Sequence, residues 1–201
     1  MRNTILNWLK NNIKIETILT KLIKNDIKNI MDIIIHKALP EDAQNYADCH
    51  ISCWQTAYKG IVPDEYLEKM LVDRQKMVDR YKERLTNPGT CEHYCVLYEE
   101  KMIGFITIDK SIKNDDLNNT GIWAVYLIEE FRNRGFGKKM LDFSIKELKS
   151  VAPKEISLWV FEENVKARRF YEKNNFIYSN IKREVDWYGK PLSQLKYVLK
   201  I

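Results

Sequence analysis

The stretch "VYLIEEFRNRGFGKKMLDF", Val125 to Phe143, decides the fold. Gly135 and Gly137 lie one residue apart between an apolar run and a run with helical character. Two glycines so close weaken a helix start, by roughly 1 kcal/mol each relative to alanine. The cations around them also repel one another: Arg132, Arg134, Lys138 and Lys139. Both costs are understandable if an anion binds there, because backbone N–H groups at a helix start attract negative charge.

Two common glycine-rich motifs do not fit this turn. A P-loop, G-x-x-x-x-G-K-[ST], would place Arg132 at the first glycine and Lys139 at the hydroxyl position. A dinucleotide fingerprint, G-x-G-x-x-G, would need its third glycine where Met140 stands. What fits is the pattern [QR]-x-x-G-x-[GA], from Arg132 to Gly137.

At this point the sequence resembles the GNAT N-acetyltransferase superfamily, whose members use that segment to cradle the pyrophosphate of acetyl-coenzyme A. A second segment, "LWVFEENVKARRFYEKNNF" at 158–176, is similar to the family's N-x-x-A-x-x-F-Y-x-x-x-G-F pattern, with Asn175 in place of the glycine. Asparagine also reaches left-handed backbone angles, so the change is tolerable. The stretch at 36–67 resembles the first strand and helices of a subset with W-x-x-x-Y-x-G-[IV]. The resemblance covers roughly residues 32–200.

The order of elements indicates a single α/β domain at 31–201, and the resemblance implies a GNAT-like, mixed and mostly antiparallel central sheet flanked by helices on both faces. Strands are expected at 32–37, in a hairpin at 93–109, and at 122–128, 156–161, 176–187 and 193–200. Helices are expected at 43–58, 64–71, 73–86, from the glycine turn to before Pro153, and at 164–175, with a loop at 110–120.

Residues 1–30 differ in composition and predict a basic amphipathic helical extension. A membrane-surface or partner-binding helix, a helix packed on its own domain, and a translation start at Met31 all stay open.

The bulk composition permits an anionic ligand. The 201 residues are 45% hydrophobic and carry a net charge of +5, which by itself does not argue for nucleic acid. No apolar run approaches the roughly 20 residues of a membrane span, and the N-terminus lacks the pattern of a secretory signal. A cytoplasmic protein is expected, without nucleic acid or membrane as a partner; a homodimer is left open.

The four cysteines raise the question of a metal. They form Cys49-x-x-x-Cys53, beside His50, and Cys91-x-His93-x-Cys95. Thiols and imidazoles bind zinc, but structural zinc sites usually use tighter pairs such as C-x-x-C. These pairs also lie inside an expected helix and an expected strand. The sequence therefore predicts reduced thiols and no metal.

The resemblance implies a reaction in which an amine attacks the acetyl thioester directly, without a covalent enzyme intermediate. Tyr171 matches the family's general acid, and a phenol with a pKa near 10 is a sensible proton donor to the departing thiolate. Backbone N–H groups of the central strand would polarise the thioester carbonyl, and Asn164 would hold the pantetheine arm, cap its helix, or both. The residues expected to bind the cofactor are Tyr126, Leu127, Arg132, Asn133, Arg134, Gly135, Phe136, Gly137, Lys138, Lys139 and Asn164.

The acceptor is expected to be a primary amine of a small molecule or peptide. Trp54, Tyr58 and Trp123, together with Trp187, are candidates for its pocket, although a place in the core is the better interpretation for any single one of them. The central strand "GIWAVYL" carries no carboxylate to act as general base. Asp109, Glu129, Glu130, His50 and a water chain are the alternatives.

Two other functional classes stay open at this point. The missing carboxylate motivates a non-catalytic acyl-coenzyme A-binding or sensor domain. The basic N-terminal helix motivates an interaction protein that docks on a membrane or on nucleic acid.

Overall fold

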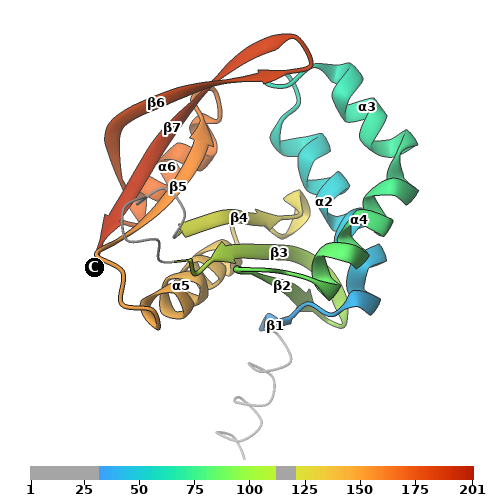
Figure 1. Cartoon of the computed structure of the whole chain (residues 1–201), viewed down its shortest axis with the longest axis horizontal. Coiled ribbons are helices and arrows are strands. Elements are labelled where there is room, and N and C mark those ends of the chain that lie inside the picture. The colour runs from blue at the N-terminus through green and yellow to red at the C-terminus, as the bar shows by residue number, and fades with distance from the viewer. Residues whose placement is uncertain (1–31, 112–120) are drawn as a thin grey trace, which may run out of the picture.

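The computed structural model describes residues 32–111 and 121–201 (Figure 1). The expected N-terminal helix at 1–30 and nearly all of the expected loop at 110–120 lie outside the described residues.

A seven-stranded sheet forms the centre of the molecule, in the order β1-β2-β3-β4-β5-β7-β6. Neighbouring strands are antiparallel except β4 and β5, which are parallel. This confirms the expected mixed and mostly antiparallel sheet. The strands are β1 (Ile34–Lys37), β2 (Cys91–Tyr98), β3 (Lys101–Asp109), β4 (Gly121–Leu127), β5 (Glu155–Phe161), β6 (Ile177–Trp187) and β7 (Lys190–Lys200).

Helices cover both faces of this sheet, as expected. On one face α2 packs against β3 and β4, with α4 alongside it, and on the other face α5 packs against the same strands. No helix within the described ranges combines the length and apolar character that a bilayer span requires. The helices are η1 (Pro40–Asp42), α2 (Ala43–Ala57), α3 (Asp64–Val72), α4 (Arg74–Thr86), η2 (Glu129–Phe131), α5 (Phe136–Lys149) and α6 (Val165–Lys173).

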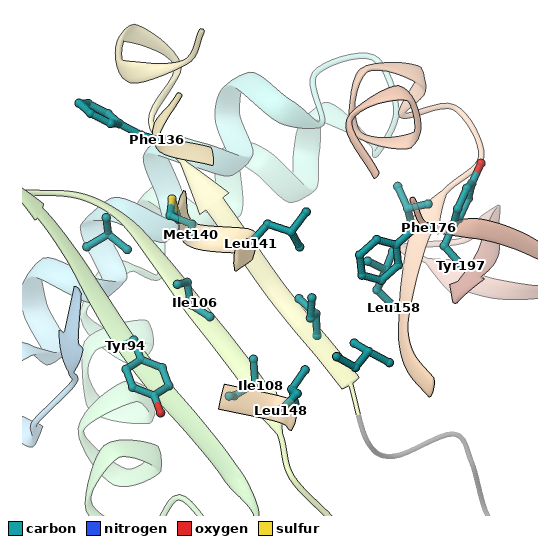
Figure 2. Packing of buried hydrophobic residues seen from close by; sticks show 14 of the residues in the cluster. Tyr94, Ile106, Ile108, Phe136, Met140, Leu141, Leu148, Leu158, Phe176 and Tyr197 are labelled. Carbon is teal, nitrogen blue, oxygen red and sulfur yellow. The ribbon is translucent and has the colours of Figure 1, made fainter. Parts of the chain in front are cut away.

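The larger core lies between the sheet and α5. Met140, Leu141 and Leu148 recur at helical spacing on one side of α5 and are fully buried. Figure 2 shows them over the strand that carries Ile106 and Ile108. Burying a side chain of this size stabilises a fold by about 1.5–3 kcal/mol. This face therefore fixes α5, and with it the glycine turn at the start of α5, against the centre of the sheet.

The parallel strands β4 and β5 are paired at one end only. Its register consists of Gly121 with Ser157 and Ile122 with Leu158. A Cβ at Gly121 would lie 2.2 Å from the Ser157 carbonyl oxygen, so the close approach requires a glycine. Beyond Ile122 the two strands separate, as Figure 1 shows. The sheet thus has a wedge-shaped opening, which we call the β4–β5 opening.

Some predicted boundaries are corrected by the structure. β1 begins at Ile34 rather than at residue 32, and β7 begins at Lys190 rather than at 193, because the Tyr188–Gly189 turn is tight. Trp123 of β4 is 63% exposed, so it is not a core residue, which was the alternative to a place in the acceptor pocket. The β3–β4 register shifts there, from Thr107–Ala124 to Ile108–Ile122, which leaves Trp123 outside the ladder.

Candidate active site

The glycine turn presents backbone N–H groups without acceptors. Asn133 and Gly135 both have positive φ, 63° and 82°, which bends the chain sharply before α5. Gly135 is the N-cap and makes no side-chain cap, and the first bond of the helix runs from the Lys139 N–H to the Gly135 carbonyl at 3.2 Å. Within the described residues, the N–H groups from Asn133 to Lys138 have no hydrogen-bond acceptor. Such a concave set at a helix N-terminus suits an anion.

The space around this turn is open on the side where a ligand would approach. A Cβ added at Gly135 would meet no heavy atom within 4 Å, whereas one at Gly137 would contact Phe170 at 3.6 Å. The two glycines therefore have different surroundings. Gly135 borders free space, and Gly137 faces α6.

The cations around the turn differ in how many hydrogen bonds and ion pairs they already make within the protein. Arg132 donates from Nε to the Leu127 carbonyl at 3.2 Å and from a terminal nitrogen to the Thr56 hydroxyl at 3.1 Å. It thereby ties the end of β4 to α2. Lys138 and Lys139 form ion pairs with Asp142 and Asp32 respectively.

Arg134 is exposed and stacks over the Phe131 ring at 5.2 Å. It has no carboxylate partner in the part of the chain that the structure describes. Among the four cations, Arg134 is therefore the one best placed to meet a phosphate.

The backbone of β4 turns one amide toward the β4–β5 opening. The Ile128 N–H donates to the Ile103 carbonyl at 2.8 Å, so Ile128 directs its polar groups toward β3. Polar groups alternate along a strand, so those of Leu127 point away from β3, where Arg132 reaches the Leu127 carbonyl. The Tyr126 carbonyl lies close to Gly104 of β3. Of the two amides predicted to polarise the thioester, alternation favours that of Leu127.

Tyr171 on α6 offers a free hydroxyl close to Tyr58 and Tyr126. Its ring packs against Phe170 and Phe176, with centroids 5.3 and 5.7 Å away. Burial, reinforced by the nearby Tyr58, raises the pKa of Tyr171 above its ordinary value. The phenol is therefore protonated at neutral pH. Among the described residues, its hydroxyl has no hydrogen-bond partner.

The hydroxyls of the two neighbouring tyrosines, Tyr58 and Tyr126, are hydrogen-bonded to each other. The Tyr58 and Tyr126 hydroxyls share a hydrogen bond of 2.5 Å. Burial raises the pKa of Tyr58 to about 12 and also raises that of Tyr126. Tyr171 is thus the one member of this trio whose hydroxyl can donate to a ligand without breaking a bond within the described part of the protein.

Asn164 positions the helix that carries Tyr171. Its side-chain oxygen accepts a hydrogen bond from the Ala167 N–H at 3.2 Å, which confirms the predicted cap. Asn164 and Tyr171 are two helical turns apart and so share one face of α6. A role for Asn164 in holding the pantetheine arm stays a prediction.

A cavity of about 360 Å³ lies on the α2 face of the sheet. Trp54 and Trp123, both predicted to bind the acceptor, line it, and Ala124 and Tyr126 of β4 form part of its wall. A neighbouring cavity of about 150 Å³ shares three of its lining residues, His50, Tyr81 and Arg84.

The other two aromatic candidates do not line these cavities. Tyr58 is buried behind Tyr126, and Trp187 packs on Trp54 with centroids 5.5 Å apart. Conversely, sequence reasoning missed Tyr81 and Arg84, because α4 carries no motif that distinguishes a lining residue from a solvated one.

His50 is the one candidate general base that lines a cavity. Its Nδ1 lies 2.5 Å from the Tyr81 hydroxyl. Burial, together with the charges of Arg84 and Arg80, lowers the pKa of His50 to about 3. An imidazole with so low a pKa is uncharged at neutral pH and a weak proton acceptor.

The carboxylate candidates are engaged elsewhere. Asp109 is buried and accepts a bond from the Ser111 N–H at 2.8 Å. Glu129 pairs with Arg132, and Glu130 pairs with Lys101. This arrangement favours water as the proton acceptor.

The cysteines are free thiols in α2 and β2, as expected. A different group brings possible metal ligands together: donor atoms of His36, Asp42 and Cys95 lie within 4.8 Å of one another. Burial raises the pKa of Cys95 to about 12, so this thiol is protonated. Asp42 accepts a bond from the Leu39 N–H at 2.8 Å. The prediction of no metal is not tested by this geometry.

Two parallel strands that separate beside a helix start suited to an anion agree with the expected acetyl-coenzyme A site. The chain belongs to the acetyltransferase (GNAT) family, whose model matches residues 52–176. It is accordingly an acyltransferase that uses acetyl-coenzyme A as donor.

Relatives and solved structures agree with this assignment. The chain is 28% identical to a spermidine N(1)-acetyltransferase of Thermoplasma acidophilum, over 73% of this chain and 89% of that one. It is 25% identical to an uncharacterized N-acetyltransferase, YuaI, of Bacillus subtilis, over 66% and 73% of the two chains. The crystal structure of PaiA N-acetyltransferase from T. acidophilum in complex with coenzyme A has the same fold, with a TM-score of 0.65 and 24% identity, over 85% of this chain and 100% of that one.

Proposed function

We propose that the protein transfers the acetyl group of acetyl-coenzyme A to a primary amine of a small molecule or peptide by direct attack. The observation that carries the proposal is that three unpartnered polar features lie on adjoining elements. They are the free N–H groups of the glycine turn, the outward amide of Leu127 and the free hydroxyl of Tyr171. Arg132 joins the turn to the Leu127 carbonyl, and Gly137 of the turn faces Phe170, which packs on Tyr171. The small-molecule substrate in the name of the Thermoplasma relative supports an amine acceptor of this kind.

The residues present fit the donor. The N–H groups of the glycine turn and the Arg134 guanidinium would hold its pyrophosphate, because both offer donors to an anion. The open side of Gly135 leaves room for it. When bound, acetyl-coenzyme A supplies an activated acetyl thioester. The Leu127 N–H would stabilise charge on the thioester oxygen, and a fixed donor of this type typically accelerates acyl transfer 10²- to 10³-fold.

The reaction balances without a covalent enzyme intermediate. The amine nitrogen bonds to the acetyl carbon while the C–S bond breaks, and the bonding pair leaves with sulfur. Tyr171 donates its proton to that sulfur. The amine nitrogen releases one proton, and water passes a proton back to the Tyr171 hydroxyl. The raised pKa of Tyr171 keeps this proton in place until the sulfur departs.

Replacing Tyr171 with phenylalanine tests the proposal. The hydroxyl makes no bond within the described structure, so its removal leaves the fold intact. We expect turnover to fall about 10²- to 10⁴-fold, the usual range for a lost general acid. Stabilisation of the protein by acetyl-coenzyme A in thermal unfolding should persist.

Tyr178→Phe is the matched control, because Tyr178 lies on β6 and lines neither cavity. Its turnover should equal that of the parent. Full turnover in Tyr171→Phe would refute the assigned role.

A further inference from the structure

Two arginines of α4 line the cavities on the α2 face of the sheet, where the predicted acceptor residues Trp54 and Trp123 lie, and have no counter-ion among the described residues. Arg80 and Arg84 are one helical turn apart, and both line the smaller cavity. Arg84 also lines the larger one. Neither has a carboxylate partner among residues 32–111 and 121–201, and the described contact of Arg84 is with the Tyr81 ring at 5.9 Å. Like charges at this spacing destabilise a helix by a few tenths of a kcal/mol, so the pair is electrostatically uncompensated.

Carboxylates near the cavities do not neutralise the charge of Arg80 and Arg84. Of the described residues that line either cavity, Asp73 is the one carboxylate. It accepts bonds from Lys69 at 2.7 Å and Lys76 at 2.8 Å, and Lys69 itself lines the smaller cavity. The cavity surface described by the structure is therefore positive.

Two histidines, the buried His93 and the half-buried His50, lie close enough to these arginines for their pKa values to respond. Burial, and then the charges of Arg84 and Arg80, lowers the pKa of His50 to about 3. Burial and Arg84 lower that of His93, which also lines the larger cavity, to about 4. Burial is the larger cause of both shifts, but the part that Arg84 and Arg80 add has the sign expected of a positive surface, which also disfavours a ligand with several ammonium groups.

We infer that the acceptor is an amine that also carries an anionic group, a carboxylate or a phosphate, which Arg84 and Arg80 bind. The inference rests on the proposed function and narrows its substrate class, away from the polyamine in the name of the Thermoplasma relative. Guanidinium groups suit both anions because they bind them bidentately. The same positive field also lowers the pKa of the incoming ammonium, which favours the neutral nucleophile where no carboxylate base stands on β4.

The test measures acetyl transfer by the full-length chain to matched acceptors. Phenylalanine against phenylalaninamide isolates the carboxylate, phosphoethanolamine against ethanolamine isolates the phosphate, and spermidine represents the polyamines. We expect kcat/KM at least tenfold higher for one of the anionic members than for its neutral partner, mainly through KM. Spermidine should be the poorest acceptor. Because amidation lowers the pKa of an α-amine, intrinsic reactivity alone would favour the amide instead.

Reversing the charge of either arginine tests whether the preference for anionic acceptors depends on it. In Arg84→Glu and Arg80→Glu the preference for the anionic acceptor should disappear and spermidine should improve. Lys82→Gln, on the same helix but lining neither cavity, should behave as the parent. All three side chains are exposed, so the fold tolerates these changes.

The outcomes separate the two proposals. Equal use of anionic and neutral partners, or a preference for spermidine, overturns the inference and leaves N-acetyl transfer standing. If no amine is acetylated although acetyl-coenzyme A stabilises the protein, the proposed function fails, and the inference fails with it.

Discussion

Gly135 and Gly137 look equivalent in the sequence but meet different physical demands. Gly135 has a φ of 82°, a region that costs a residue with a Cβ about 1–2 kcal/mol. Gly137 does not have a positive φ, and a Cβ there would make an ordinary contact with Phe170. The first glycine is therefore required by the backbone, whereas the second lies within the first turn of α5.

The two alanine variants should consequently differ in sign. We expect Gly135→Ala to lower the free energy of unfolding by about 1–2 kcal/mol because of the left-handed backbone. Gly137→Ala should be neutral or stabilise by up to about 1 kcal/mol, because alanine favours helix. Urea unfolding of both variants measures this difference. A larger loss in Gly137→Ala than in Gly135→Ala would contradict this account of the turn.

At the scale of elements, the two ends of α6 fix the position of Tyr171. Asn164 caps the helix, and Asn175 ends it with a φ of 66°, which asparagine tolerates in place of the family's glycine. None of the residues of α6 is fully buried. The position of Tyr171 therefore depends on these caps as well as on the contacts of Phe170 and Ala167 with the core.

Removing the cap should affect both stability and catalysis. We expect Asn164→Ala to lower the free energy of unfolding by about 1 kcal/mol, within the usual range of 0.5–2 for a lost N-cap. It should also reduce kcat, because the turn that carries Tyr171 loses its anchor. Urea unfolding and steady-state kinetics measure the two effects.

Asn164→Ser is the matched control, since serine also caps. If the serine variant keeps stability but loses acetyl-coenzyme A affinity, Asn164 contacts the pantetheine arm as well. Unchanged kcat and stability in the alanine variant would show that α6 does not depend on this cap.

At the scale of the whole molecule, local patterns predicted the elements and tertiary contacts decided the site. The glycine turn, the Asn164 cap and the succession of elements along the chain follow from short-range spacing, whereas the mostly antiparallel sheet was implied by the family resemblance, and the structure confirms the fold. The hydrogen bond from Arg132 to Thr56 joins residues 76 positions apart, so no local sequence pattern predicts it. Arg80 and Arg84 read as solvated residues of a polar helix until α4 is placed over the cavity. The exposure of Trp123 depends on the register with β3.

The buried His93 and the half-buried His50 make the stability of the whole fold depend on pH. In the native protein the pKa of His50 is lowered to about 3 and that of His93 to about 4, mainly by burial. The ordinary histidine pKa is about 6.5 in the unfolded chain. Between these values the unfolded state binds more protons, so the free energy of unfolding rises with pH. The contribution is complete above about pH 6.5 and is lost progressively as the pH falls toward 4.

Urea unfolding at pH 7.5, 6.5, 5.75 and 5.0 measures this dependence. Below pH 6.5 each histidine contributes a slope of at most about 1.4 kcal/mol per pH unit, and most carboxylates remain ionised down to pH 5. The slope should therefore shrink in His93→Gln and shrink further in the double variant His50→Gln/His93→Gln, even if both variants are less stable at pH 7.5. An identical slope in parent and double variant would show that groups other than these two histidines take up the protons.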